Sequence, residues 1–213
     1  DHRLVRAIKL PSSEYNKPLI IDFPGHGDSK GFSSNRIESY SKFLVDSLAA
    51  HDLKDISLCG HSMGGLVALD MVAKHKHSVK SLILVNSIYP TRVADALIAK
   101  AKTGNGQAAD FIIKYGLHRR LLGLKNAFSH GDEPVMLNDL EACNDYQLDI
   151  NELKNLRISI SIILGSKDRL VDLKAVEKFT DVVPSQIYTM EEVGHFSFFE
   201  DPEKLSKLIS EIA

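Results

Sequence analysis

A glycine-rich segment with a serine at its centre is the part of the sequence that most directly indicates chemistry. The segment Gly60–Gly65 reads GHSMGG and fits the pattern G-x-S-x-G. A short apolar run precedes it and a run with helical spacing follows, which is the strand–turn–helix context that gives this pattern meaning. The alternative is a glycine-rich turn in which the serine is incidental. The context favours Ser62 as a nucleophile.

The residue types around Ser62 suit a hydroxyl held on a tight turn. A strained backbone at the serine leaves room only for small residues two positions away, which accounts for Gly60 and Gly64. Such a turn lifts the serine hydroxyl above a sheet and places it at a helix N-terminus. The backbone N–H of Met63 is then expected to point at the oxyanion that forms when the serine attacks a carbonyl group.

A serine hydroxyl is a weak nucleophile at neutral pH and needs a base within hydrogen-bonding distance. Among the nine histidines of the chain, we expect His195 to be this base. It lies between the last predicted strand and the last predicted helix, and sites in α/β sheets are built at strand ends. His26, in a turn after an earlier predicted strand, is its main rival. His61 lies beside the serine, where packing is the simpler role.

A base of this kind needs a carboxylate that fixes its tautomer and stabilises its protonated form. Asp168 follows a predicted strand within Gly165–Asp168 and is our candidate. Asp172 is the nearest rival, and we expect it to cap the helix that follows.

Short apolar runs alternate with longer segments of helical period along the chain. We predict strands at residues 18–23, 56–59, 81–85, 158–164 and 186–190, and helices at 37–50, from the glycine-rich turn to about 74, and at 202–213. Nearly continuous apolar strands that alternate with helices predict an α/β protein. Its central sheet is mostly parallel and flanked by helices on both faces.

Residues 87–153 break this alternation, because their spacing is helical and glycine-rich breaks interrupt it. We expect a small helical insertion after the third predicted strand, with residues 1–86 and 154–213 forming the core. The apolar side chains of the insertion could form its own core or line a pocket. They are Leu97, Ile98, Phe111, Ile112, Leu121, Leu122, Leu124 and Phe128.

Taken together, these features resemble the α/β-hydrolase superfamily in its serine esterase and lipase-like form. Five stretches carry the resemblance, at residues 22–29, 60–65, 165–168, 194–196 and 199–202. The chain order Ser62, Asp168, His195 is the order expected of α/β-hydrolases and differs from that of the two protease folds with the same triad. The resemblance implies acyl-hydrolase chemistry without a cofactor or metal, and a cap over the active site formed by the insertion.

One motif of that family is absent from the sequence. The family normally has a His-Gly pair after an earlier strand, in a loop that supplies a second oxyanion N–H. Only 21 residues precede Asp22, and they contain no such pair. Leu4, Val5 and Ile8 are spaced like the helix that follows that loop. Either an N-terminal portion is missing from this sequence or the protein is a short variant. We favour the first, because a sheet without those strands exposes an apolar edge.

Composition narrows the remaining possibilities. Hydrophobic residues make up 44% of the chain, charged residues 25%, and the net charge is -2, which is typical of a soluble globular protein and predicts no nucleic-acid partner. No apolar run approaches the roughly 18 residues of a membrane span. The two cysteines are Cys59 and Cys143. Because Cys59 lies in a run predicted to be a buried strand, we expect a reduced, cytoplasmic protein.

The sequence therefore predicts hydrolysis of a small-molecule carboxylic ester through an acyl-enzyme intermediate, with a small to medium apolar acyl or alcohol group. Two alternatives stay open. One is a carbon–carbon bond hydrolase or lyase that uses the same triad. The other is a non-catalytic binding protein with the same fold.

Overall fold

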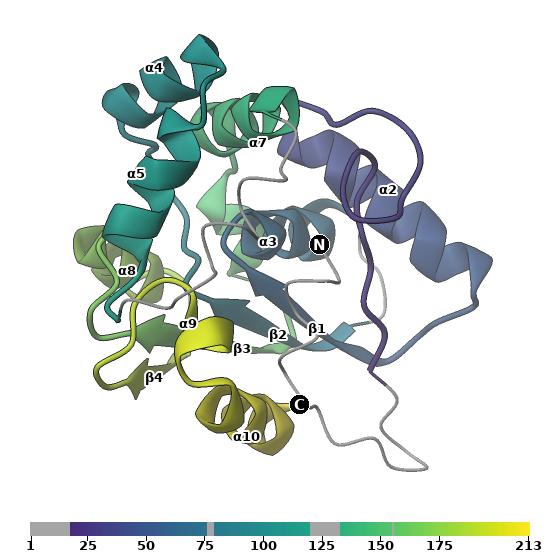
Figure 1. Cartoon of the computed structure of the whole chain (residues 1–213). Helices are drawn as coiled ribbons and strands as arrows, with labels where there is room; N and C mark the ends of the chain where they lie inside the picture. The colour runs from purple at the N-terminus through teal and green to yellow at the C-terminus, as the bar shows by residue number, and fades with distance from the viewer. Residues whose placement is uncertain (1–17, 76–78, 120–132, 155) are drawn as a thin grey trace.

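The computed structural model describes residues 18–75, 79–119, 133–154 and 156–213 (Figure 1). Within these ranges the chain forms a four-stranded sheet in the order β1 (Ile56–His61), β2 (Val79–Val85), β3 (Ser159–Gly165) and β4 (Gln186–Met190). Each neighbouring pair of strands is parallel. Four of the five predicted strands are thus found, and the predicted α/β class is confirmed.

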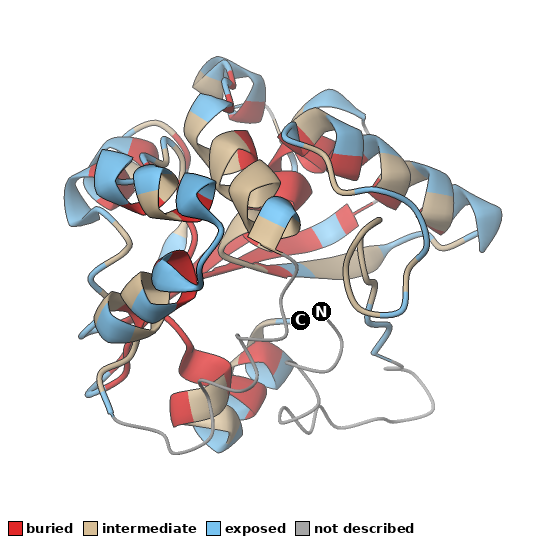
Figure 2. Cartoon of the chain, turned by 45° about the horizontal axis from the view of Figure 1, so that its top comes forward, coloured by how far each residue is buried: buried red, intermediate tan, exposed pale blue. Residues whose placement is uncertain are grey.

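Each face of the sheet packs against its own hydrophobic cluster. Leu82 and Leu84 of β2 belong to the larger cluster, whereas Ile83 and Val85 belong to the other. Successive side chains of a strand point to opposite faces, so an unbroken apolar strand serves both clusters. Figure 2 shows that the two central strands, β2 and β3, are largely buried, whereas the outer strands β1 and β4 are only partly so.

Helices cover both faces of the sheet, as predicted. The helices α2 (Ile37–Ala50), α3 (Met63–Lys74) and α8 (Leu173–Thr180) contribute to the larger cluster. The last helix, α10 (Pro202–Ile212), lies on the opposite face after the short helix α9 (Ser197–Glu200) (Figure 1). Proline occupies the first turn of α10, where its missing N–H removes no helical hydrogen bond. Within the described ranges, no helix is both long and apolar enough to cross a membrane.

The segment between β2 and β3 contains α4 (Asp95–Thr103), α5 (Gln107–Gly116), α7 (Glu133–Asp145) and a 3₁₀ helix, η1 (Ile150–Leu153). The predicted break between α4 and α5 is a turn in which Gly104 and Gly106 have φ angles of 63° and 78°. These left-handed conformations favour glycine. The helices α4, α5 and α7 pack around a separate small core that includes Leu97 and Ala101.

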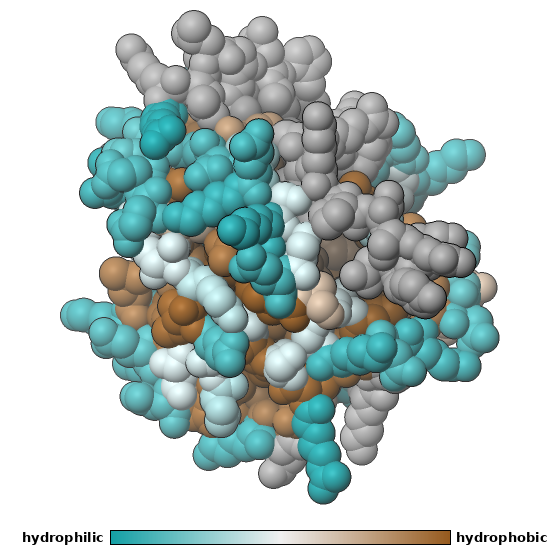
Figure 3. Space-filling view, turned by 90° about the horizontal axis from the view of Figure 1, so that it is seen from below, coloured by the Kyte–Doolittle hydropathy of each residue, from teal (hydrophilic) through white to brown (hydrophobic). Residues whose placement is uncertain are grey.

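Two expectations at the edge of the sheet are wrong. Residues 18–23 form no strand, because they pair with no neighbouring strand in the described part of the chain. Leu19 and Ile20 accordingly stay 60% and 46% exposed. Cys59 is exposed rather than buried, since β1 is the outer strand of the described sheet. The other large apolar side chains that are exposed are Phe32, Leu173 and Ile187. Figure 3 shows brown patches between polar side chains on the face seen from below. The helix expected around Leu4 and Ile8 lies outside the described residues.

Candidate active site

Ser62 lies between the end of β1 and the start of α3, as the glycine-rich pattern predicts. Its φ and ψ are 50° and −122°, a conformation that costs a residue with a side chain about 1–3 kcal/mol. Residues at and just after the end of β2 hold Ser62 in this conformation by hydrogen bonds to its N–H and its carbonyl. The Ser62 N–H donates to the carbonyl of Val85 at 3.1 Å, and the Ser87 hydroxyl donates to the Ser62 carbonyl at 2.7 Å.

The glycines around Ser62 differ in what they allow. A methyl group at Gly60 would overlap the backbone of Gly64, so the first glycine is required by close packing. A methyl group at Gly64 would meet nothing within 4 Å. The expectation that Gly64 must be small because of crowding is therefore wrong. The crowded position is Gly65, where a methyl group would overlap the Ser87 side chain.

The three predicted catalytic side chains form one chain of hydrogen bonds. His195 Nε2 lies 3.0 Å from Ser62 Oγ, and His195 Nδ1 lies 2.8 Å from Asp168 Oδ2. The histidine and aspartate side chains are only 7% and 3% exposed. Because Asp168 as a carboxylate accepts hydrogen bonds only, Nδ1 carries the proton and leaves the Nε2 lone pair toward the serine.

Asp168 is fixed by its own loop. While Oδ2 faces the histidine, Oδ1 accepts from the backbone N–H groups of Leu170 at 2.7 Å and Val171 at 3.2 Å. This buried carboxylate is therefore fully hydrogen-bonded and oriented. The rival carboxylate, Asp172, caps α8 by accepting from the N–H of Lys174 at 2.9 Å, as expected.

His61 packs behind the base. Its ring centroid lies 4.8 Å from those of His195 and Phe198, and its Nε2 lies 2.8 Å from the His195 carbonyl oxygen. Burial, with a contribution from the nearby His195, lowers the His61 pKa to about 3. The ring is thus neutral near pH 7. Since a carbonyl only accepts, Nε2 carries its proton and donates to His195.

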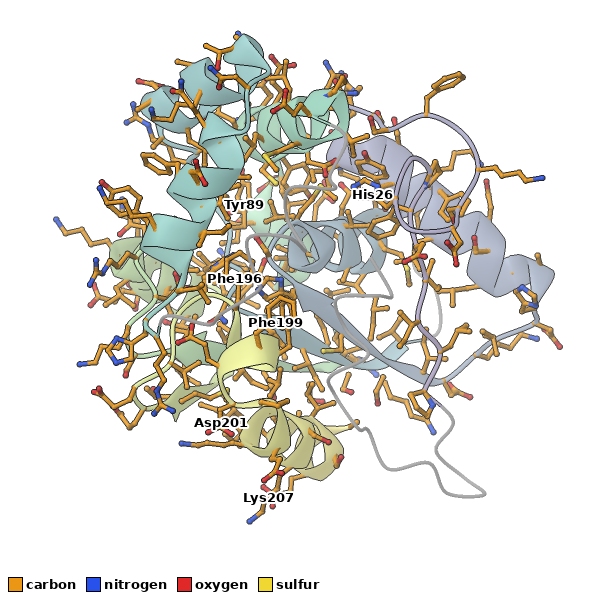
Figure 4. All side chains as sticks on the ribbon, in the orientation of Figure 1. His26, Tyr89, Phe196, Phe199, Asp201 and Lys207 are labelled. Atoms are coloured by element: carbon orange, nitrogen blue, oxygen red, sulfur yellow. The ribbon has the colours of Figure 1, made fainter. Side chains whose placement is uncertain are left out.

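The other rival base, His26, points to a different partner. Its Nε2 lies 2.7 Å from Asp139 Oδ2, on α7 of the insertion. Figure 4 shows His26 beside α2, apart from Phe196, which follows His195 next to α9. The geometry places His195, and not His26, at the serine.

A cavity of about 1420 Å³ contains Ser62, Met63 and His195 in its wall. It exceeds the roughly 300–1,000 Å³ of an ordinary ligand pocket because it continues along β1 to Leu19. Three of the predicted apolar residues of the insertion, Leu97, Phe111 and Ile112, line it. Ile98 packs within the small core of the insertion. Leu121, Leu122, Leu124 and Phe128 lie outside the described residues.

The predicted donor to the oxyanion, the backbone N–H of Met63, lies in the first turn of α3. Met63 is the first residue of that helix, where a backbone N–H has no helical acceptor.

Among the described residues, no group of three or more His, Cys, Asp or Glu side chains is arranged to hold a metal ion.

Sequence reasoning missed the residues that support the triad from behind. Asn86 and Ser87 directly follow β2, and both donate hydrogen bonds to backbone carbonyls of triad residues, His195 and Ser62. Glu200 accepts from the N–H of Gly194, beside the base. Two polar residues at the carboxyl end of a strand next to the serine strand were a usable signal, because sites form at that edge.

Comparison with known proteins identifies the family of this fold. The family model described as "Alpha/beta hydrolase family" matches residues 7–208, so the chain belongs to the alpha/beta hydrolase family. The predicted superfamily is confirmed.

Individual relatives share about a quarter of their residues with this chain. A pimeloyl-[acyl-carrier protein] methyl ester esterase of Aromatoleum aromaticum is 26% identical, over 89% of this chain and 84% of its own. A 3-oxoadipate enol-lactonase of Acinetobacter baylyi is also 26% identical, over 93% and 78%. The solved structure of an esterase from Exiguobacterium antarcticum has a TM-score of 0.80 at 21% identity, covering 90% of this chain and 79% of that one. The prediction of a hydrolase that acts on ester bonds agrees with these relatives.

Proposed function

We propose that the protein is a serine hydrolase that cleaves small-molecule carboxylic esters through an acyl-enzyme intermediate. The observation that carries the proposal is the aligned path from Ser62 Oγ through the His195 ring to Asp168, with contacts of 3.0 and 2.8 Å. Nucleophile, base and orienting carboxylate thus stand within hydrogen-bonding distance in the order that acyl transfer needs.

The proposed reaction has two steps. His195 Nε2 takes the hydroxyl proton of Ser62 while Oγ bonds to the ester carbonyl carbon, and the oxyanion develops toward the Met63 N–H. His195 then returns the proton to the leaving alcohol as the carbon–oxygen bond breaks. His195 then deprotonates a water molecule, which attacks the acyl carbon. The bond between that carbon and Ser62 Oγ breaks, the acid is released, and His195 passes the proton to Oγ, which restores Ser62. Asp168 stabilises the protonated ring in both steps.

The cavity favours an ester with a small to medium apolar group. Leu97, Phe111 and Ile112 of the insertion line the same space as Ser62. Apolar walls with a few polar groups near the reacting atom are typical of small-molecule sites. In this proposal the insertion acts as a cap that selects the substrate. The enol-lactonase relative makes cyclic esters a second group to test, because a lactone reacts through the same acyl-enzyme.

Two other functions use the same residues differently. A carbon–carbon bond hydrolase or lyase would need the triad but would leave simple esters intact. A binding protein would have no need of a hydrogen-bonded Ser62, so the observed geometry weighs against it. Three kinds of reagent distinguish the ester hydrolase, the carbon–carbon bond enzyme and the binding protein. They are a series of p-nitrophenyl esters from acetate to laurate, a set of lactones and a fluorophosphonate probe.

We expect hydrolysis of the shorter esters and labelling by the probe, with Ser62→Ala lowering kcat on the order of 10⁴-fold or more. Ser47→Ala is the matched control, because the Ser47 hydroxyl only bonds the Phe43 carbonyl within α2. His195→Ala should abolish labelling as well. Labelling without ester turnover would favour the carbon–carbon chemistry, and neither labelling nor turnover would favour the binding protein.

We further propose that the protein works in the cytoplasm. Cys59 and Cys143 are both free, which is usual where thiols are kept reduced. Cell fractionation with detection of the native protein tests this location.

A further inference from the structure

We propose that Asn86 is a positioning residue of this active site, one that holds the backbone of His195 and the strand leading to Asp168 at a fixed separation. The inference rests on the proposed role of His195 as the base. Asn86 would act on the reacting groups only through its neighbours.

Asn86 is itself firmly held at the end of β2. It is 1% exposed, and its backbone N–H donates to the carbonyl of Ile163 on β3 at 2.8 Å. Its φ is 45°, in the left-handed region that asparagine tolerates better than most residues. The side-chain amide therefore starts from a rigid strand end and points into the space between neighbouring loops.

The nitrogen end of this amide binds the loop of the base. Nδ2 donates to the His195 carbonyl oxygen at 2.6 Å and lies 3.2 Å from the Ser197 hydroxyl. The same His195 carbonyl receives the His61 Nε2 proton from the other side. Two donors on one carbonyl, the Asn86 amide and the His61 ring, fix the backbone of the residue that carries the proposed catalytic ring.

The oxygen of the Asn86 amide binds the end of β3, the strand that leads to Asp168. Oδ1 accepts from the N–H of Gly165, the last residue of β3, at 2.8 Å. The Gly165 carbonyl then accepts from the N–H of Asp168 at 3.0 Å, which closes the turn that carries the carboxylate. A methyl group at Gly165 would overlap the Val193 and Gly194 carbonyls, so the two loops touch where the amide joins them.

Only a group with a donor and an acceptor a short distance apart can make both contacts. The Gly165 N–H requires an acceptor and the His195 carbonyl requires a donor, which sets the orientation of the amide. If the hydrogen bond from Asn86 Nδ2 is lost, the loop that carries His195 is free to shift by a fraction of an ångström. Such misplacement lowers the rate because the Ser62–His195 contact must form in the reactive geometry.

Two substitutions separate the two ends. Asn86→Asp keeps an acceptor for Gly165 but replaces the donor to His195 with an oxygen, and Asn86→Ala removes both ends. Tyr146→Phe is the matched control, because it deletes another buried hydrogen bond, from the Tyr146 hydroxyl to Asp70 at 2.9 Å, outside the cavity wall. kcat, KM and the rate of fluorophosphonate labelling are measured well below the melting temperature of each variant.

We expect kcat and the labelling rate to fall roughly a hundredfold in Asn86→Asp with KM little changed, and a crystal structure of this variant should show the His195 ring displaced from Ser62. Tyr146→Phe should lower the melting temperature and keep kcat. A folded Asn86→Asp variant with wild-type kcat and an unmoved ring would overturn the inference. If the wild-type protein neither hydrolyses esters nor reacts with the probe, the proposed function fails, and the crystal structure still decides whether Asn86 positions His195.

Discussion

The strained conformation of Ser62 is maintained by residues on a neighbouring strand. Val85 and Ser87 bind its N–H and its carbonyl, so the serine cannot relax without losing two hydrogen bonds. Gly65 gives Ser87 the room to make its contact. The backbone geometry of Ser62 thus depends on a glycine that lies outside the G-x-S-x-G pattern.

A matched pair of substitutions tests this dependence. Gly65→Ala places a methyl group on the Ser87 side chain, whereas Gly64→Ala points one into open space. We expect Gly65→Ala to lower the free energy of unfolding by about 1–3 kcal/mol, the usual cost of overpacking, and to reduce the labelling rate of Ser62. Gly64→Ala should leave the stability unchanged or raise it by up to about 1 kcal/mol, because alanine favours a helix. Equal losses in urea unfolding would contradict the assignment.

The neutral ring of His61 makes stability depend on pH. Its folded pKa of about 3 lies below its ordinary value of 6.5, so the unfolded chain binds a proton first as the pH falls. The contribution of His61 to stability is complete above pH 6.5 and is lost on acidification by up to about 1.4 kcal/mol per pH unit. His61→Gln retains a side-chain N–H donor and removes the titration.

Urea unfolding at about pH 5 and about pH 7.5 measures this slope. The difference in stability between the two should be smaller in His61→Gln than in the wild-type protein. His75→Gln, at the exposed end of α3, should keep the wild-type difference. A wild-type slope retained in His61→Gln would show that another group is responsible.

Between elements, the clearest link joins the insertion to the core. Oδ2 of Asp139, on α7, lies 2.7 Å from His26 Nε2. Its Oδ1 accepts a hydrogen bond from the Tyr40 hydroxyl of α2 at 2.9 Å. Burial works against protonation of His26, but the hydrogen bond and charge of Asp139, with the Pro24 carbonyl, raise its pKa above 6.5. The stability from this pair is complete below pH 6.5 and is lost as the pH rises through the folded value.

Asp139→Asn should therefore lower the His26 pKa, measured by NMR titration of the imidazole ring protons. The variant should also lose stability chiefly on the acidic side, where the charged pair exists. Tyr40→Phe is the control, because it removes a hydrogen bond to Asp139 and keeps its charge. An unchanged His26 pKa in Asp139→Asn would disprove the link.

At this scale the sequence predicts some elements much better than others. Strands such as residues 158–164 are recognisable because a short, nearly continuous apolar run is typical of a parallel strand that is buried on both faces. Residues 18–23 have the same pattern and form no strand, since a strand exists only where a partner pairs with it. His195 and Asp168 are predictable from their positions after strands. The role of Asn86 is not, because it depends on which backbone groups lie opposite after folding.

Across the whole molecule, the insertion and the core meet at His195. The His195 N–H donates to the carbonyl of Gly116, the last residue of α5, at 2.6 Å. Glu200, only 9% exposed, accepts from the N–H groups of Gly194 at 3.0 Å and Arg119 at 3.0 Å. One buried carboxylate therefore joins the segment that follows α5 to the loop that carries His195.

This arrangement predicts that insertion and core unfold together and that Glu200 couples them. Glu200→Gln turns an N–H₂ group toward backbone N–H donors, and an unsatisfied buried group costs about 1–3 kcal/mol. We expect one unfolding transition in the wild-type protein by both calorimetry and circular dichroism, at a higher temperature than in Glu200→Gln. Glu203→Gln, on the exposed side of α10, should match the wild-type protein. Because Glu200 holds the residue next to His195, ester hydrolysis should fall with stability in Glu200→Gln. Two separate transitions in the wild-type protein would show instead that the insertion folds independently of the core.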